Sequence, residues 1–276
     1  MAPLPAGDDR LRVWLARHRR VFALTGAGCS TASGIADYRD HNGDWKRRPP
    51  LMFQAFRAEE GVYRRYWARA YAGWPHFIAA VPNATHHAFA AWEAAGTLAH
   101  LVTQNVDGLH QRAGSRAVID LHGRLDVVVC LGCRARTPRA AVQEAMAAAN
   151  PAWHDAGPAA PDGDADLEAA AIDAFAPPRC GRCGGFLKPD VVFFGENVPP
   201  ERYERAREAL AGADALLVAG SSLMVYSGFR FVRLAHDAGL PIAIVNRGRT
   251  RGDDLAELKV EGDVGSTLAG AVAALA

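Results

Sequence analysis

The chain is organised around the stretch LVTQNVDGLH (residues 101–110), which is followed by LHG at residues 121–123. An apolar run at residues 97–102 predicts a buried strand, and that strand ends in amide, carboxylate and imidazole side chains. In an open α/β sheet, ligands bind just beyond the carboxyl ends of the strands. A second apolar run, at residues 117–121, delivers His122 with a glycine directly behind it. We therefore expect two strand ends to present one amide–carboxylate–imidazole cluster.

The composition of the chain is typical of a globular protein. The chain has 276 residues, of which 50% are hydrophobic and 22% charged, which is typical of a globular protein with a sizeable core. The formal net charge of +1 gives no electrostatic footprint for nucleic acid or an anionic membrane. No apolar run approaches the roughly 18 residues that span a bilayer, and the first ten residues show no signal-peptide pattern. We expect a cytoplasmic protein with no nucleic-acid or membrane partner, and the frequent Ala, Arg and Gly favour a bacterial source.

A glycine loop follows the first predicted strand. The apolar residues 21–25 run straight into GAGCST (residues 26–31), after an amphipathic helix predicted at residues 11–20. Glycines in such a loop let backbone N–H groups approach a phosphate, although an ordinary tight turn is the alternative. The usual dehydrogenase fingerprint would place its third glycine at Thr31, and the polar residues 33–40 do not continue as a long helix. The sequence therefore predicts a dinucleotide loop of a different kind.

Two further strand-and-loop units occur near the end of the chain. Apolar residues 215–219 lead into GSS (residues 220–222), and apolar residues 241–245 lead into NRG (residues 246–248). Strands that alternate with polar loops and helices predict an α/β fold with a doubly wound, parallel, Rossmann-like sheet. The predicted strand ends open on one edge: Thr25, Thr103, Gly220 and Asn246.

Two CxxC pairs, at residues 130–133 and 180–183, predict a metal site. Four thiolates in two tight turns suit one tetrahedral Zn²⁺, and a full set of cysteine ligands leaves no position for a catalytic water, so the ion would be structural. Disulfides and a CxxC redox pair are the alternatives. Between the pairs, residues 150–178 are expected to form a loop with one short helix at residues 166–175.

Residues 41–84 predict a helical excursion from the sheet, because their apolar side chains recur at helical spacing. Within it, Tyr66 and Arg69 lie three residues apart and would share a helix face. They are either an aromatic ring packed beneath a solvated arginine, or a phenol and a guanidinium that together bind a carboxylate.

His86 opens the next helix, and we expect no catalytic role for it. The segment KPDVVFFGE (residues 188–196) suits a peptide that docks as an added strand.

Several of these segments resemble the sirtuins. GAGCSTASGIADYRD resembles the sirtuin signature, TQNVDGLH resembles a second sirtuin motif, and LHG resembles the family's catalytic-histidine segment. The CxxC pairs, KPDVVFFGE, GSSL and VNRG follow in the family's order, so the resemblance covers nearly the whole chain. RYWAR (residues 65–69), GWP (73–75) and APDGD (160–164) are similar to the class II branch, which includes the fourth human, mitochondrial sirtuin.

Two positions depart from the sirtuin pattern. Ala36 stands where the family usually has proline, which leaves the loop less rigid. Cys29 stands where isoleucine is common, and we interpret it as a small packing residue rather than a redox switch.

The resemblance implies an NAD-dependent protein-lysine deacylase, for acetyl or for longer, branched or acidic acyl chains. It would act as a monomer on an acyl-lysine protein or peptide and release nicotinamide and O-acyl-ADP-ribose. His122 would be the general base on the ribose, Asn105 and Asp107 would position the nicotinamide ribose and carboxamide, and Tyr38 and Arg39 would shield the reacting centre from water. An ADP-ribosyltransferase using the same NAD site and a non-catalytic acyl-lysine reader are the alternatives.

The resemblance also assigns sites and segments. The NAD contacts would be Gly26, Ala27, Gly28, Ser30, Thr31, Ile35, Asp37, Tyr38, Arg39, Gln104, Asn105, Asp107, His122, Gly220, Ser221, Ser222, Asn246, Arg247, Gly248 and Val264. The substrate contacts would be Tyr66, Arg69, Val191, Phe193, Gly195 and Glu196, and the zinc ligands Cys130, Cys133, Cys180 and Cys183. We expect one catalytic domain over residues 1–276, with a Rossmann-like part (10–40, 86–126 and 188–276), a helical insertion (41–85) and a zinc-binding module (127–187).

Overall fold

The structure is a computed structural model that describes residues 9–37, 40, 42, 44, 46, 51–153 and 172–273. The expected roles of Tyr38 and Arg39, and the class II segment at residues 160–164, lie outside these described residues. Most of the helix predicted at residues 166–175 lies outside them too. Of that helix, residues 172–175 are described: Ile172 and Asp173 are helical, whereas Ala174 and Phe175 are not.

The chain forms two compact units. The Rossmann-like unit contains Met1–Arg48, Val81–His122 and Val198–Ala276, and the four-cysteine unit contains Pro49–Ala80 and Gly123–Asn197. This grouping differs from the segments expected from the sequence, because it combines most of the helical insertion with the cysteine module. Residues 188–197, expected in the Rossmann-like part, also belong to the four-cysteine unit, since their strand pairs there.

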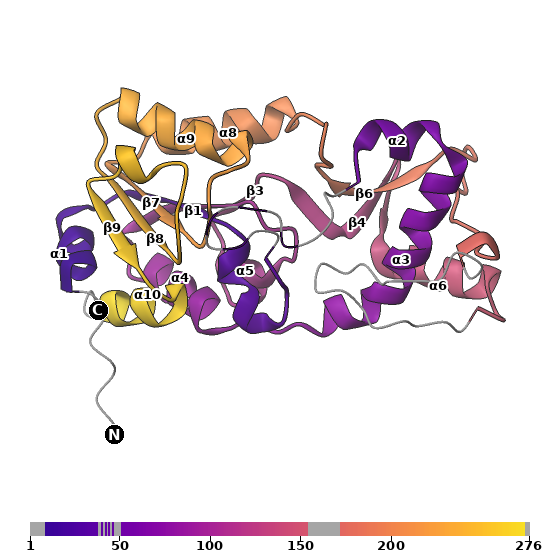
Figure 1. The fold of residues 1–276 in the computed structure, drawn as a ribbon, viewed down its shortest axis with the longest axis horizontal. Coiled ribbons are helices and arrows are strands. Elements are labelled where there is room, and N and C mark those ends of the chain that lie inside the picture. Colours follow the sequence, from indigo (N-terminus) through magenta and orange to yellow (C-terminus); the bar gives the residue numbers. More distant parts are fainter. Residues whose placement is uncertain are drawn as a thin grey trace, which may run out of the picture. The chain divides into compact units, whose positions relative to one another are not determined.

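The Rossmann-like unit is built on a parallel sheet of six strands in the order β3-β2-β1-β7-β8-β9 (Figure 1). All neighbouring strands run parallel. The strands β1 and β7 have the predicted bounds, and β2, β3 and β8 differ from their predictions by one residue at each end; β9 was not predicted. The bounds are β1 Val21–Thr25, β2 Leu98–Thr103, β3 Val118–Asp120, β7 Ala215–Ala219, β8 Ile242–Asn246 and β9 Leu258–Glu261.

This strand order places a binding crevice. Numbered along the sheet's own strands, it is 3-2-1-4-5-6, the order of doubly wound dinucleotide-binding folds. The order reverses between β1 and β7, which lie side by side with Thr25 opposite Ala219. Ligands of such sheets bind at this reversal, outside the carboxyl ends of the strands.

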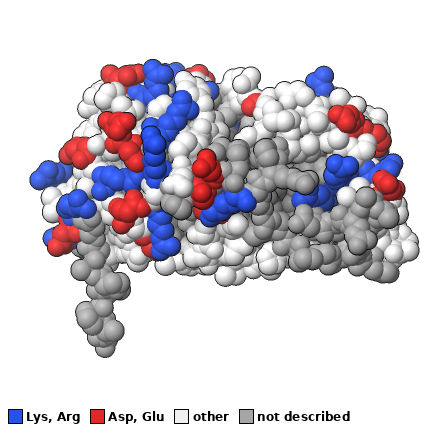
Figure 2. Space-filling model, viewed as in Figure 1, with Lys and Arg blue, Asp and Glu red and all other residues white. Residues whose placement is uncertain are grey.

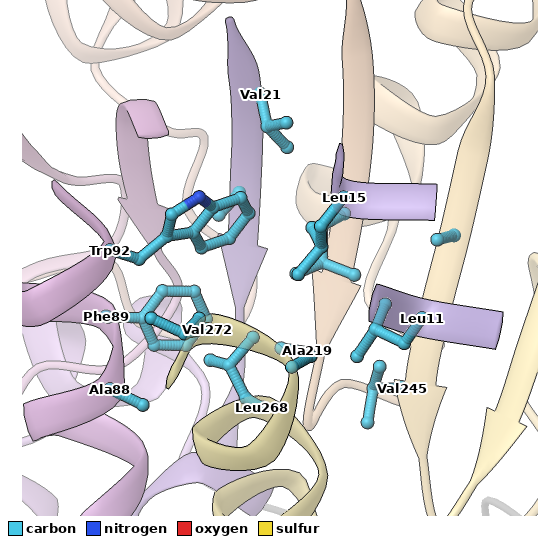
Figure 3. Close-up of a cluster of buried hydrophobic side chains, with 14 of the residues drawn as sticks. Leu11, Leu15, Val21, Ala88, Phe89, Trp92, Ala219, Val245, Leu268 and Val272 are labelled. Atoms are coloured by element: carbon cyan, nitrogen blue, oxygen red, sulfur yellow. The ribbon is translucent and has the colours of Figure 1, made fainter. Parts of the chain in front are cut away.

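Helices cover both faces of the parallel sheet (Figure 1). Because side chains alternate along a strand, Val21 and Ala23 belong to one apolar core, and Phe22 and Leu24 to the other. The first core includes the fully buried Trp92 and side chains from α1, α4 and α10 (Figure 3). The helices over the first face are α1 Asp9–Arg17, α4 Ala84–Ala94 and α10 Val264–Ala273, and those over the second are α8 Pro200–Ala211 and α9 Tyr226–Asp237.

The four-cysteine unit is smaller and mostly antiparallel. Its sheet has the order β5-β4-β6, so β6 is an edge strand, as expected for the KPDVVFFGE segment. The fully buried Phe56, Tyr63 and Trp67 fill an aromatic core beside it. The elements are α2 Phe53–Ala58, α3 Glu60–Ala79, β4 Gly123–Cys130, β5 Arg136–Pro138, α6 Arg139–Ala149 and β6 Leu187–Val191.

A proline interrupts α3, and α6 compensates for it. Pro75 lies inside α3 and has no N–H, so the carbonyl of Tyr71 has no intrahelical donor four residues on. The side chain of Gln143, on α6, donates to that carbonyl at 3.0 Å. One turn earlier on α6, Arg139 donates to the carbonyl of Ala70 at 3.0 Å. Gln143 therefore satisfies the carbonyl that Pro75 leaves without its helical donor, and both side chains attach α3 to α6.

Charged side chains of both signs are intermixed on the face shown in Figure 2. Among the described residues, no helix has the length and apolar character that crossing a bilayer requires.

The remaining short helices lie in loops. They are η1 Ala27–Cys29, η2 Thr31–Ser33, α5 Leu109–Arg112 and η3 Asp253–Leu255.

Candidate functional site

Two glycine loops interlock where the sheet order reverses. A Cβ on Gly26 would lie 2.7 Å from the Cβ of Ser221, and a Cβ on Gly28 would lie 2.9 Å from the Cα of Gly220. The N–H of Gly28 donates to the carbonyl of Gly220 at 2.8 Å. The glycines are therefore needed for contact between the β1 and β7 loops. The N–H of Gly28 is used inside the protein, which differs from the phosphate contact suggested by the sequence.

Three predicted site residues form one hydrogen-bonded group beside these loops. The buried hydroxyl of Ser30 donates to the carboxylate of Asp107 at 2.7 Å. The amide of Asn105 donates to Ser30 Oγ and to the carbonyl of Gly26, both at 3.0 Å. The other oxygen of Asp107 accepts from the N–H of Leu109 at 2.9 Å. The loops after β1 and β2 are thus fixed to each other by the side chains predicted to contact NAD.

A buried histidine supports this group from behind. The Nδ1 of His86 accepts from the backbone N–H of Asn83 at 3.1 Å, so in the neutral ring Nε2 carries the proton. That Nε2 lies 3.4 Å from Ser30 Oγ. Burial lowers the pKa of His86 to about 4, although the Asp107 carboxylate opposes the shift. His86, for which we expected no catalytic role, therefore acts as a neutral donor that holds Ser30.

A second buried imidazole lies beside it. The ring of His110 is 4.8 Å from that of His86, and its Nε2 is 3.1 Å from the hydroxyl of Thr25. Burial and the neighbouring His86 lower the pKa of His110 to about 3. Both rings are therefore neutral near pH 7.

His122 is held at both ring nitrogens. Its Nδ1 lies 2.9 Å from the backbone carbonyl of Gln104, which can only accept, so Nδ1 carries the proton. Its Nε2 lies 2.7 Å from the hydroxyl of Ser227, in the first turn of α9. Burial lowers the pKa of His122 to about 4; the Gln104 carbonyl opposes this shift and the charge of Arg202 adds to it. The imidazole is thus neutral at pH 7, and its lone pair is on Nε2.

Gln104 connects His122 to the glycine loops. Its side-chain amide donates to Ser221 Oγ at 2.9 Å and to the carbonyl of Thr25 at 3.2 Å. The side chain also lies so close to Gly228 that a Cβ there would overlap it. Gln104, in the loop after β2, therefore contacts both the loop after β7 and the start of α9.

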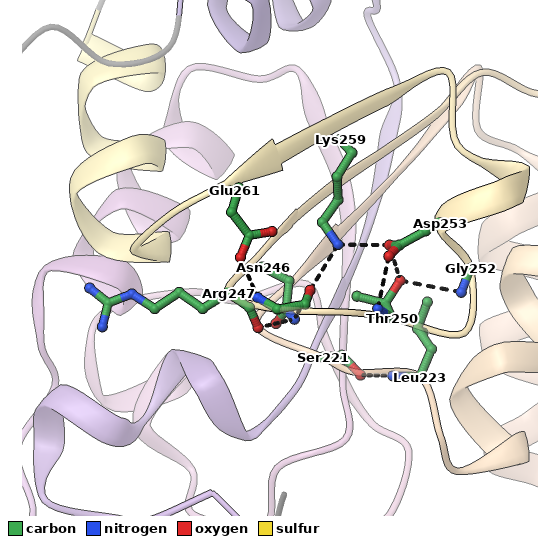
Figure 4. Close-up of polar contacts among 10 residues, drawn as sticks. Ser221, Leu223, Asn246, Arg247, Thr250, Gly252, Asp253, Lys259 and Glu261 are labelled. Atoms are coloured by element: carbon green, nitrogen blue, oxygen red, sulfur yellow. Dashed lines mark hydrogen bonds and ion pairs between the residues drawn. The ribbon is translucent and has the colours of Figure 1, made fainter. Parts of the chain in front are cut away.

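The loop after β8 is stabilised by its own polar network (Figure 4). The amide of Asn246 donates to the carbonyl of Arg247 at 2.7 Å, and Glu261 accepts from the N–H of Gly248. Lys259 donates to the carbonyl of Gly248 at 3.0 Å and to Asp253 at 2.7 Å. This network fixes Asn246, Arg247 and Gly248, three of the predicted NAD contacts.

Asp253 anchors the same loop. Burial would raise its pKa, but hydrogen bonds from Lys259 and Thr250 outweigh burial and hold the pKa below its ordinary value. The carboxylate therefore stays charged and keeps the loop in place at neutral pH.

The four cysteines of the two CxxC pairs come together in the four-cysteine unit. Their sulfur atoms all lie within 4.8 Å of one another, with Cys130 and Cys183 at 3.5 Å and Cys133 and Cys180 at 3.7 Å. A zinc ion with sulfur ligands at about 2.3 Å requires neighbouring sulfurs about 3.8 Å apart. The four cysteines are thus placed to bind one structural metal ion, and a cluster of thiolates suits Zn²⁺.

Comparison with known proteins is consistent with this geometry. The model of the Sir2 family matches residues 26–227, which is most of the chain. The chain belongs to the Sir2 family. It is 62% identical over 260 residues to a protein of Xanthomonas campestris pv. campestris named "NAD-dependent protein deacetylase", with 94% of this chain and 89% of the relative covered.

Other matches agree with that assignment. A protein of Bradyrhizobium diazoefficiens named "NAD-dependent protein deacetylase 2" is 58% identical over 263 residues, covering 95% of this chain and 96% of the relative. A solved structure described as "Sir2-p53 peptide-NAD+" has 30% sequence identity and a TM-score of 0.74, covering 95% of each chain. The expected resemblance to the sirtuins is therefore confirmed, and the fold is the Rossmann-like fold of the Sir2 family.

The remaining predicted NAD contacts of this Sir2 protein lie near the same strand ends. Asp37 forms an ion pair with Lys46 at 2.5 Å, and Thr31 donates to the carbonyl of Gly28 at 3.2 Å. Val264 is buried in the first apolar core at the start of α10. Ala27 and Ile35 lie in the loop after β1, and Ser222 in the loop after β7.

The predicted substrate contacts all lie in the four-cysteine unit. The ring of Tyr66 packs against Phe56 and Phe193, at 5.1 and 5.2 Å between ring centres, and Arg69 lies one turn later on α3. Val191 and Phe193 are buried. For Tyr66, this agrees with the packed aromatic ring that the sequence allowed.

Glu196 has a partner within the same unit. Its carboxylate accepts from the buried Lys188 at 2.8 Å and from the N–H of Phe193 at 2.8 Å. Gly195 has φ +83°, and its carbonyl accepts from Gln54 at 3.0 Å. Glu196 therefore fixes the conformation of the predicted peptide-docking segment.

Ser227 contacts the predicted catalytic histidine, and the sequence motifs did not single it out. It lies 105 residues after His122, in a helix that the motif reading did not use. The one signal in the sequence was a serine beside Gly228, just after the GSSL loop of the family pattern.

Proposed function

We propose that this chain is an NAD-dependent protein-lysine deacylase; its relatives are named NAD-dependent protein deacetylases. The observation that carries the proposal is the site at the carboxyl edge of the parallel sheet. There the linked Ser30, Asn105 and Asp107 lie at the sheet's reversal point, and His122 offers a neutral imidazole with a basic Nε2. In the implied reaction NAD is consumed, and the acyl group leaves lysine and ends on ADP-ribose.

His122 would be the general base. Its Nδ1–H is held by the Gln104 carbonyl, so Nε2 is the atom that accepts a proton from a ribose hydroxyl. With a pKa lowered to about 4, the ring is already deprotonated at neutral pH. It therefore needs no preceding proton loss before it acts.

Asn105 and Asp107 would position the nicotinamide ribose and carboxamide. Both are fixed by Ser30, and Ser30 is in turn held by the neutral His86. Groups that are already ordered need less reorganisation when a substrate binds. The loop after β8, with Asn246, would hold the adenosine ribose.

Zinc, when bound, would supply structural cross-linking of the two CxxC turns and no chemistry. All four ligand positions are cysteines, so no open position for water remains. A cytoplasmic location suits this site, because thiols stay reduced there. We further propose that the protein acts as a monomer.

The acyl preference is the finer part of the proposal. Tyr66 and Arg69 share a face of α3, and together they would bind a carboxylate at the end of an acidic acyl chain. Arg69→Met should then reduce removal of succinyl or glutaryl groups more than removal of acetyl. Equal losses on all chains would argue for a packing role.

The test is NAD-dependent release of nicotinamide from a panel of acyl-lysine peptides: acetyl, butyryl, lipoyl, succinyl, glutaryl and 3-hydroxy-3-methylglutaryl. We expect turnover on at least one chain, appearance of O-acyl-ADP-ribose, and loss of turnover in His122→Ala. No turnover on any chain by a protein that still binds NAD would exclude the deacylase. Transfer of adenosine label to protein would instead indicate ADP-ribosyl transfer.

A further inference from the structure

The basic nitrogen of His122 already has a partner within the Rossmann-like unit. A neutral imidazole has one lone pair, and with Nδ1 protonated it is on Nε2. The hydroxyl of Ser227 lies 2.7 Å from that atom, a short distance for a hydroxyl donor. Ser227 therefore occupies the lone pair that general-base catalysis would use.

The local packing brings Ser227 to this place. Ser227 lies in the first turn of α9, and the next residue is Gly228. The side chain of Gln104 fills the space where a Cβ of Gly228 would be, and the carbonyl of Gln104 accepts from Nδ1. Gln104 thus contacts both the histidine and the helix that carries the serine.

A hydroxyl suits both protonation states of the ring. Serine is a donor and an acceptor, so it donates to Nε2 when His122 is neutral and accepts from Nε2–H after rotation when the ring is charged. The positive charge of Arg202, on α8, disfavours the charged ring, and burial does so more strongly. An acceptor at Nε2 therefore stabilises the imidazole most when the ring is protonated.

We propose that Ser227 is a positioning residue for His122: it holds the imidazole in place and accepts the Nε2–H that forms when His122 takes a proton from a ribose hydroxyl. In this step the ribose hydroxyl replaces Ser227 as the donor to Nε2: the ribose O–H bond breaks, its proton forms the Nε2–H bond, and the electron pair stays on the ribose oxygen. The oxygen of Ser227 then accepts from Nε2–H. Because Ser227 accepts the new N–H, the proton is not held by the ribose oxygen, which stays nucleophilic. This inference rests on the proposed function of His122.

The test compares Ser227→Ala and Ser227→Thr with the unchanged protein, on the best acyl-peptide of the panel. Ser227→Ala should lower kcat by about ten- to a hundredfold, less than loss of the base itself, and leave KM for NAD unchanged. A charged ring loses more than a neutral one when its partner is removed, so the pKa of His122 falls further. The acid limb of the pH profile of kcat/KM should then move to lower pH by about one unit. Ser227→Thr keeps the hydroxyl and should recover most of the rate.

A second measurement reads the contact without turnover. The ¹⁵N signals of His122, identified by their loss in His122→Ala, should titrate at lower pH in Ser227→Ala than in the unchanged protein. Ser266→Ala is the matched control, because Ser266 is also in the first turn of a helix but is exposed, and its hydroxyl hydrogen-bonds to Asp263. It should change neither the rate nor the titration.

The outcomes separate the two proposals. If the unchanged protein turns over no acyl-peptide, the deacylase proposal fails, and the ¹⁵N titration still tests the contact. If it is active and Ser227→Ala matches it in kcat, the role of Ser227 is refuted. A lower kcat with an unmoved acid limb and an unmoved titration would also overturn it, because a merely structural defect gives that pattern.

Discussion

The two units of this protein are stabilised in different ways. The Rossmann-like unit has a six-stranded parallel sheet with an apolar core on each face. The four-cysteine unit has a three-stranded sheet, an aromatic cluster and four thiols gathered around one point. A small core supplies little net stability, so small units depend on metals or cross-links. The first unit carries the buried imidazoles, and we expect the second to depend for its stability on a metal bound by its four cysteines.

Metal removal should give the largest difference between the units. Structural zinc contributes on the order of 10 kcal/mol to folding. We expect Cys133→Ser, or chelation, to abolish hydrogen-exchange protection in β4, β6 and α3, while β1, β2 and β7 keep theirs. Cys29→Ser is the control, because Cys29 is buried in the other unit and is no ligand. Uniform loss of protection in both units would show that they do not differ in this way.

A cavity in the first apolar core should destabilise the Rossmann-like unit rather than the four-cysteine unit. Trp92 is fully buried between the sheet and its helices, so Trp92→Ala should lower the free energy of unfolding by about 3–5 kcal/mol. The loss should appear in urea denaturation, and exchange should accelerate in β1, β2 and α4. Zinc content, measured by mass spectrometry, should stay at one ion per chain; its loss would contradict the separation.

Acid should weaken the Rossmann-like unit selectively. The pKa values of His86, His110 and His122 are lowered to about 4, 3 and 4 by burial. Each is neutral in the folded state and takes up a proton on unfolding below about pH 6.5. Their contribution is therefore full above that pH and is lost as the pH falls toward 4, at on the order of a few kcal/mol per histidine.

Urea denaturation at pH 7, 6 and 5 measures this dependence. His86→Asn should reduce the slope of stability against pH. The exposed His76, in the four-cysteine unit, is the control, and His76→Gln should leave the slope unchanged. An unchanged slope in His86→Asn would contradict the assignment.

The smallest expected effect concerns the broken helix. Gln143→Ala leaves the carbonyl of Tyr71 without a donor and should destabilise the protein by about 1 kcal/mol. Pro75→Ala restores the backbone N–H, so in that background Gln143→Ala should cost less. A double-mutant cycle measures the difference, and simple additivity would show that the two residues do not compensate each other.

Much of the fold could be predicted, because local sequence determines it. The strands β1 and β7 are fully buried apolar runs of ordinary strand length, so their bounds follow from the sequence alone. The strand β9 was missed because only Val260 in it is buried and its pattern is weak. Asn105 and His122 were found because each follows a predicted strand end.

Contacts between distant segments could not be predicted in this way. The bond between His122 and Ser227 depends on how α9 packs, and no local pattern records that. The same holds for His86, which reaches Ser30 across 56 residues. Pairing of β6 with β4 likewise placed residues 188–197 in the four-cysteine unit rather than the Rossmann-like one.

The order of the segments along the chain also determines the order in which the protein can be completed during synthesis. The four-cysteine unit is finished when Asn197 has left the ribosome, whereas the Rossmann-like unit still lacks Val198–Ala276. Until β7 emerges, β1 has a partner on one side alone and its other edge is open. Since units fold as they are made, we expect the metal-binding unit to form first, leaving the NAD-binding sheet half assembled until β7, β8 and β9 have emerged.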